Sequence, residues 1–95
     1  MTAHLDSSSE LRTMIGAILD DVGNEVLAAS SAWPPMNSAH EGYGVLLEEV
    51  DELWEQVKVK QGNRDIAKMD KETIQVAAMA VRFALDITRG GREQK

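Results

Sequence analysis

Apolar residues recur at helical spacing in three segments of the chain, and the first segment lies within residues 9–29. Its apolar side chains follow steps of three and four residues: Leu11, Ile15, Ile18, Leu19, Val22 and Val26. This spacing predicts an amphipathic helix, with Ser7, Ser8 and Ser9 as candidate N-caps. The helix should end at Trp33-Pro34-Pro35, because proline cannot continue the ladder of backbone hydrogen bonds.

The second predicted helix begins at Ser38, and its pattern fades over residues 58–62. Ser38 and Glu41 have the spacing of a capping box, in which a serine is followed three residues later by a glutamate. One apolar face follows, formed by Tyr43, Leu46, Leu47, Val50, Leu53, Trp54 and Val57. The polar residues 63–70 predict a connection that contains one helical turn after Asp65.

The third predicted helix covers residues 70–88 and is apolar on two sides. The first face is formed by Ile74, Ala77, Ala78, Val81 and Leu85. The second is formed by Val76, Ala80, Phe83 and Ile87. Gly90-Gly91 predicts the end of the helix. If the first face packs inside the chain, the second needs a partner, so we expect a homodimer or a dimer of dimers. The alternative is that the first helix and the Trp33 segment cover the second face within one chain.

No segment has the pattern of a strand, so we expect an all-α fold. It would be a small bundle of three main helices and a short helical turn, completed by oligomerisation into a larger bundle. A chain of 95 residues suits one domain. We assign residues 9–89 to it and expect flexible tails at residues 1–8 and 90–95.

The composition indicates the cellular location and excludes some kinds of site. No stretch approaches the roughly 20 apolar residues that span a bilayer, and Met1 to Glu10 lack the basic and apolar regions of a signal peptide. We therefore expect a cytoplasmic protein without membrane contact. The sequence has no cysteine, which excludes disulfides, a thiol nucleophile and a thiolate zinc site.

Charge is distributed unevenly along the chain. The formal net charge is -6, opposite in sign to a typical nucleic-acid-binding surface, so no nucleic-acid partner is expected. Residues 1–57 carry eleven carboxylates and a single cation, Arg12. Residues 58–95 carry nine cations and five carboxylates. The first part is suited to metal cations, and the second to an anion.

The second helix concentrates carboxylates next to its apolar face. They are Glu41, Glu48, Glu49, Asp51, Glu52 and Glu55. Glu49 and Glu52 lie three residues apart at the flank of the apolar face, so their carboxylates can converge on one point. A hard cation such as Mg²⁺ would remove their mutual repulsion. The alternative is a solvated acidic face without a ligand.

The third helix carries one narrow polar stripe among apolar positions. It consists of Lys68, Glu72, Gln75, Met79, Arg82 and Asp86. Charges on a buried stripe must be paired or bind a ligand. The structural alternative is a network in which Arg82 pairs with Glu72 or Asp86.

Together, the segments Glu48-Glu49-Val50-Asp51-Glu52 and Glu72-Thr73-Ile74-Gln75 resemble the signature of the MazG-like, all-α nucleoside triphosphate pyrophosphohydrolases. That signature is E-x-x-E, an interval, and then E-x-x-D on an antiparallel helix. Glu49 and Glu52 match its first part, and Glu72 begins the second. Gln75 stands where the family has aspartate. The resemblance covers residues 36–88 and is closest to small bacterial and phage members.

The resemblance implies hydrolysis of a nucleoside triphosphate to the monophosphate and pyrophosphate, with Mg²⁺ or Mn²⁺ as cofactor. Glu49, Glu52, Glu72 and Gln75 would be the metal ligands, and Glu48 or Glu49 the general base. Gln75 offers a neutral oxygen without charge. The second hypothesis is a non-catalytic helical oligomer of the same fold that binds a metal, a nucleotide or a protein partner.

The remaining candidates would bind substrate. Lys68 and Lys71 are candidates for the outer phosphates, although a solvated basic loop explains them as well. Arg82 is a third candidate, from the polar stripe. His40 and Trp54 are candidates for contact with the base, against the simpler interpretations of a surface histidine and a core tryptophan. Trp33 could line a base pocket or close the helix hairpin.

Overall fold

The computed structural model describes the backbone of residues 2–92 and the side chains from residue 8 onward. Over this range the chain forms three α-helices and no strand: α1 (Thr2–Ala32), α2 (Ala39–Val57) and α3 (Ile66–Phe83). A 3-10 turn, η1 (Gln61–Asn63), connects α2 to α3, and α3 continues into a π-helical turn, η2 (Ala84–Thr88). The all-α class predicted from the spacing of apolar residues is confirmed.

Helix α1 is longer than predicted. It begins at Thr2 instead of Ser9, so Ser7, Ser8 and Ser9 lie inside the helix and do not cap it. Residues 2–8 contain neither proline nor glycine, and nothing in them interrupts a helix. The C-terminal end at Ala32, just before Trp33-Pro34-Pro35, agrees with the prediction.

Side chains fix the start of α2 as the capping pattern predicts. The Ser38 hydroxyl oxygen accepts a hydrogen bond from the backbone N–H of Glu41 at 3.0 Å. The Glu41 carboxylate does not return to Ser38, as it would in a complete capping box. It accepts instead from the backbone N–H and the side-chain amide of Asn37, at 3.1 and 3.0 Å. Both contacts hold the turn between α1 and α2 in place.

Helix α3 begins four residues before the predicted start at Asp70. The Asp65 carboxylate accepts from the backbone N–H of Lys68 at 3.1 Å and caps the helix. The helical turn predicted after Asp65 is therefore the first turn of α3. At the other end, Gly90 has φ 58 and stops the helix, as predicted.

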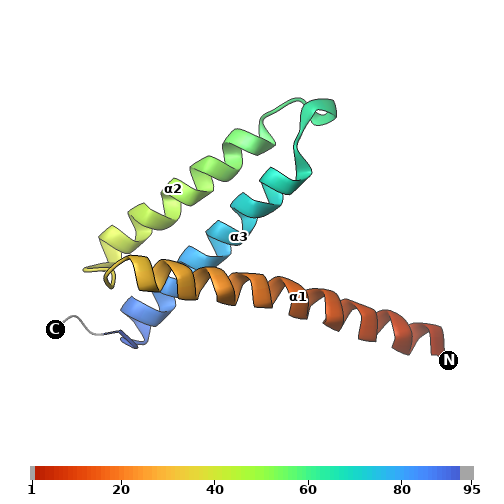
Figure 1. Ribbon diagram of the computed structural model, residues 1–95, viewed down its shortest axis with the longest axis horizontal. Helices are drawn as coiled ribbons and strands as arrows, with labels where there is room; N and C mark the ends of the chain where they lie inside the picture. Colours follow the sequence, from red (N-terminus) through yellow and green to blue (C-terminus); the bar gives the residue numbers. More distant parts are fainter. Residues whose placement is uncertain (1, 93–95) are drawn as a thin grey trace.

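Helix α3 is central in the arrangement (Figure 1). It runs antiparallel to α2, and the C-terminal half of α1 crosses it. The core lies at this crossing and consists of Val22, Val26, Ala29, Ala78 and Met79. Val45, Leu46, Ile74 and Ala77 pack against it. The central position of α3 explains why its sequence is apolar on two sides.

The two apolar faces of α3 are used differently from the prediction. A Cβ atom at Gly42 would lie 2.6 Å from Cδ2 of Phe83, so the Phe83 ring rests directly on the backbone of α2. Phe83 was expected to face a partner. Conversely, Val81, expected in the core, is 45% exposed. The predicted inward face is confirmed at Ile74, Ala77 and Ala78, which lie in or against the core, and is wrong at Val81. Phe83 packs within the chain because glycine at position 42 leaves room for its ring.

Most of the exposed large apolar side chains lie on α1 and α2. The N-terminal half of α1 extends away from the other helices (Figure 1). It exposes Leu11, Met14, Ile15, Ile18 and Leu19. On α2, Leu47, Val50 and Trp54 are also exposed. None of the described helices is both long enough and apolar enough to cross a membrane.

Candidate metal and ligand site

Three carboxylates from two helices converge at one point. Glu49 and Glu52 of α2 and Glu72 of α3 each offer an oxygen atom, and these atoms lie within 4.8 Å of one another. The pairing of antiparallel α2 and α3 brings Glu72 to the two glutamates, which share one flank of α2 because they are three residues apart. The convergence predicted from the sequence is confirmed, and we call these three residues the acidic cluster.

When all three groups are ionised, the carboxylates of the acidic cluster repel one another and destabilise the folded chain. Partial burial, with the charges of Glu52, Glu72 and Glu48, raises the pKa of Glu49 to about 7. Burial and the neighbouring Glu52 carboxyl also raise the pKa of Glu72, and Lys71 and Lys68 partly offset this rise. Oε2 of Glu72 is buried without a hydrogen-bond donor. A bound proton or cation would satisfy this buried oxygen.

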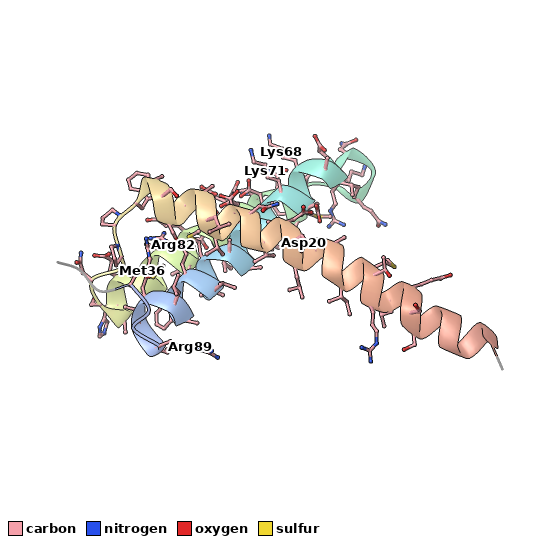
Figure 2. All side chains as sticks on the ribbon, turned by 60° about the horizontal axis from the view of Figure 1, so that its bottom comes forward. Asp20, Met36, Lys68, Lys71, Arg82 and Arg89 are labelled. Atoms are coloured by element: carbon pink, nitrogen blue, oxygen red, sulfur yellow. The ribbon has the colours of Figure 1, made fainter. Side chains whose placement is uncertain are left out.

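Lys68 and Lys71 lie on the side of α3 next to this cluster. Their charges lower the pKa of Glu72, which places both ammonium groups within electrostatic reach of it. Figure 2 shows the two side chains projecting together near the start of α3. Both residues are exposed. They are therefore positioned to meet an anion that approaches the acidic cluster from solvent.

A cavity of about 610 Å³ adjoins the cluster. It lies between the C-terminal half of α1 and the N-terminal half of α2, with α3 as its floor. Its lining is formed by Glu25, Ala28, Ala29, Ala32, Trp33, Pro34, Met36, Glu41, Val45, Glu48, Glu49, Gln75, Met79 and Arg82. Glu49 belongs to both the cavity and the acidic cluster, so a single ligand can occupy both. The volume is in the usual range for small-molecule sites.

Gln75 and Glu48 lie on the wall of this cavity together with Glu49. Gln75 follows Glu72 by three residues on α3, so both belong to the same side of the helix. Glu48 is exposed, whereas Glu49 is half-buried. Gln75 also lines a smaller cavity, of about 310 Å³, with Asp21, Asn24, Glu25, Lys71 and Ile74.

Arg82 lies at the opposite end of the cavity. The residue is only 4% exposed. Its Nη2 donates to the carbonyl oxygen of Pro34 at 3.1 Å and lies 3.9 Å from Oδ2 of Asp86. Nη1 makes a long contact of 3.8 Å with Sδ of Met79, and the Nε–H has no acceptor. The predicted pairing of Arg82 with Asp86 is therefore loose, and Arg82 does not pair with Glu72.

The main partner of Asp86 is Arg92, a residue of the segment predicted to be a flexible tail. Arg92 donates to both carboxylate oxygens of Asp86, at 2.7 and 2.9 Å. It also donates to the carbonyl oxygen of Ser30 at 2.8 Å. The pKa of Asp86 is lowered, mainly by its hydrogen bonds with Arg92 and also by the backbone N–H of Met36. The contact joins η2 to the end of α1; residues 93–95 of the predicted tail lie outside the described residues.

Only Arg82 of the five predicted substrate-binding residues lines the larger cavity; the other four are Lys68, Lys71, His40 and Trp54. His40 is exposed on the first turn of α2 and is not part of the lining. Trp54 also lies outside the lining, and it is 57% exposed, so it is not a core residue in this chain either. The aromatic residue on the cavity wall is Trp33. The sequence left open whether Trp33 lines a pocket or closes the helix hairpin. Glu25 and Met36 were not singled out, because their roles depend on the way α1 crosses α3.

Comparisons with known proteins found no relative of this chain. No family model matches the chain, and neither a curated protein nor a solved structure matches it.

Proposed function

We propose that the protein is a Mg²⁺-dependent nucleoside triphosphate pyrophosphohydrolase, in which Mn²⁺ can replace Mg²⁺. The reaction consumes water and breaks the anhydride bond between the α- and β-phosphates, which yields the monophosphate and pyrophosphate. The observation that carries this proposal is the convergence of Glu49, Glu52 and Glu72 within 4.8 Å at the edge of a ligand-sized cavity. The resemblance of the two acidic segments to the MazG-like signature supports it.

The residues present suit a hard divalent cation. Glu49, Glu52 and Glu72 offer carboxylate oxygens, and one oxygen of Glu72 is buried without a donor. Gln75 adds a neutral oxygen on the same side of α3 as Glu72. When bound, Mg²⁺ screens the charge of the phosphates and acidifies a water molecule. The protein itself supplies the position of these ligands, which the pairing of α2 and α3 fixes.

Other side chains would handle the proton and the outer phosphates. Glu48 lies on the cavity wall and outside the acidic cluster, so its carboxylate is available to accept the proton of the attacking water. Glu49 is the alternative base. Lys68 and Lys71 lie beside Glu72 and would pair with the outer phosphates of the leaving pyrophosphate.

The second candidate function is a non-catalytic relative that binds metal or nucleotide without turnover. Gln75 favours it, because a glutamine replaces the charged aspartate of the MazG-like signature and lowers the total negative charge available to the metal. The two candidates share the metal site and differ in turnover. An activity measurement therefore separates them, whereas a binding measurement does not.

The test is release of pyrophosphate from a panel of canonical and modified nucleoside triphosphates. We expect turnover with Mg²⁺ or Mn²⁺ and none in EDTA. Glu49→Gln should reduce the rate at least about 100-fold. Asp51→Asn is the matched control, because Asp51 is an exposed carboxylate of α2 outside the acidic cluster. If no substrate yields pyrophosphate, hydrolysis is refuted and only the non-catalytic candidate remains. An unchanged rate in Glu49→Gln would refute the metal site.

We further propose that the chain acts as a homodimer or a dimer of dimers. A compact 10.4 kDa monomer exposes about 5,400 Å², whereas this chain exposes 7045 Å². The excess matches the area that each subunit loses in a large, obligate interface. The apolar side chains on the extended half of α1 are the natural contact, and a second copy offers the complementary apolar surface. We place the reaction in the cytoplasm, consistent with a chain without cysteine.

A further inference from the structure

The turn between α1 and α2 is irregular, and side chains from α3 and η2 hold its backbone. Residues 33–38 form no regular helix. Nη2 of Arg82 donates a hydrogen bond to the carbonyl oxygen of Pro34 at 3.1 Å. The backbone N–H of Met36 donates to Oδ2 of Asp86, also at 3.1 Å. The turn is therefore bonded to buried charged groups that lie about 50 residues later in the chain.

Arg92 joins the same network to the end of α1. Its Nε and Nη2 donate to the two carboxylate oxygens of Asp86, at 2.7 and 2.9 Å. Nη1 donates to the carbonyl oxygen of Ser30 at 2.8 Å and to that of Trp33 at 3.3 Å. The carboxylate of Asp86 is fully buried, and the side chain of Arg92 is 20% exposed. One planar guanidinium group thus connects η2 to the last carbonyl groups of α1.

The backbone before Arg92 is shaped for this contact. Gly90 has φ 58, a left-handed conformation that favours glycine. The N–H of Gly91 donates to the carbonyl oxygen of Leu85. A Cβ atom at Gly91 would lie 2.7 Å from Cδ1 of Leu85. The chain therefore turns back closely against η2, and this reversal returns the side chain of Arg92 to Asp86.

The turn that this network holds forms one end of the large cavity. Trp33, Pro34 and Met36 line the cavity next to Arg82, whereas Arg92 is not part of the lining. The acidic cluster adjoins the other end. The place of these three wall residues therefore depends on a side chain that touches no ligand in the cavity.

We propose that Arg92 is a positioning residue for the ligand cavity, because its guanidinium group keeps the α1–α2 turn where it forms the cavity wall. The alternative is that Arg92 only neutralises the buried carboxylate of Asp86. A second guanidinium group, that of Arg82, already lies 3.9 Å from this carboxylate. The bonds from Arg92 to carbonyl oxygens also contribute nothing to neutralisation, whereas they fix the end of α1 directly.

Hydrogen exchange of backbone amides, followed by NMR in EDTA without ligand, tests the position of the turn. Met36 is the reporter, because its N–H lies outside the helices and donates to Asp86. Arg92→Met keeps the apolar stem and removes every donor. We expect it to accelerate exchange at Met36 at least about 10-fold more than at Ala78 of the core, as expected for lost hydrogen bonds to a charged group.

The matched control is Arg89→Met. Arg89 is exposed, and Figure 2 shows it projecting away from the end of η2, whereas Met36 and Arg82 lie together below the last turns of α1. This variant removes a guanidinium group from the same segment and should change neither amide. An unchanged rate at Met36 in Arg92→Met, or equal acceleration at Met36 and Ala78, would overturn the proposal, because the effect would then be absent or would act on the whole fold.

Arg92→Lys separates positioning from neutralisation. Lysine keeps a positive charge beside Asp86, and it preserves the fold if Arg92→Met does not. Its single ammonium group cannot bind both carboxylate oxygens and the carbonyl groups of α1 at once. We expect exchange at Met36 to rise at least about 5-fold above the parent rate. A parent rate in Arg92→Lys would show that charge alone is needed and would refute the positioning role.

The kinetic part of the test rests on the proposed function. In the pyrophosphate assay, Arg92→Lys should raise KM at least about 5-fold and leave kcat within about 2-fold, because the acidic cluster lies at the other end of the cavity. A parent KM, or a loss confined to kcat, would contradict a role in the cavity wall. If the parent releases no pyrophosphate, hydrolysis is refuted, and the amide exchange alone decides the role of Arg92.

Discussion

Replacing Glu49 by glutamine should stabilise the metal-free protein at neutral and alkaline pH and have little effect near pH 5. The pKa of Glu49 rises from 4.5 to about 7 on folding because of burial and the neighbouring carboxylates. The folded state therefore binds more protons than the unfolded state between these two values, and stability falls as pH rises through this window. Glutamine has the shape of the protonated side chain and never ionises. Glu49→Gln therefore avoids this loss of stability.

The size of the effect follows from the shift. A difference of about 2.5 pKa units corresponds to roughly 3 kcal/mol at 1.36 kcal/mol per unit. This is an upper value, because salt and solvent screen a half-buried group. We expect Glu49→Gln to exceed the parent by about 1–3 kcal/mol at pH 8.5 and to match it within about 0.5 kcal/mol at pH 5.

The assay is urea unfolding followed by circular dichroism at both pH values, in EDTA and at one protein concentration. Asp51→Asn serves as the control for removing a carboxylate from α2, and it should show no comparable dependence on pH. Adding Mg²⁺ should stabilise the parent at pH 8.5 and leave Glu49→Gln nearly unchanged. A variant that equals the parent at pH 8.5, or gains as much at pH 5, would refute the account of the acidic cluster.

Four further predictions concern the packing of the helices, the metal site and the oligomer. Gly42→Ala should destabilise the fold by about 1–3 kcal/mol in urea unfolding, because its Cβ would meet an aromatic ring at 2.6 Å. Gly44→Ala, with open space around it, should instead gain about 0.5–1 kcal/mol. Gln75→Asp should tighten Mg²⁺ in calorimetric titration; equal affinity would show that residue 75 is no ligand. Ile15→Glu with Ile18→Glu should convert a sedimenting oligomer into a 10.4 kDa monomer, and a monomeric parent contradicts the interface.

Local spacing was sufficient to predict the three helices, though not the starts of α1 and α3, and the proximity of Glu49 and Glu52. Glu49 and Glu52 share a flank of α2 because helical geometry places residues three apart together. Glu72 was added to them by the resemblance of its segment to the second part of the MazG-like signature. The helical repeat explains the first two residues, and the antiparallel pairing of α2 and α3 explains how the third meets them.

Contacts that depend on the crossing of α1 and α3 could not be predicted in the same way. Arg92 reaches Asp86 and the carbonyl oxygen of Ser30 across the fold, and no periodic pattern links these positions. A signal was present, since a buried aspartate on the stripe needs a cation. The packing of Phe83 on Gly42 of α2 also leaves no periodic signal, because glycine has no side chain to mark a place of close approach.

The central claim is the hydrolysis of a nucleoside triphosphate at the α–β bond with the help of the acidic cluster. Phosphorus-31 NMR of a triphosphate incubated with the protein and Mg²⁺ tests it most directly, because the spectrum distinguishes the two sets of products. We expect equal amounts of monophosphate and pyrophosphate, and neither product in EDTA or with Glu49→Gln. A spectrum that shows the diphosphate and inorganic phosphate, or the unchanged triphosphate across the substrate panel, would contradict it.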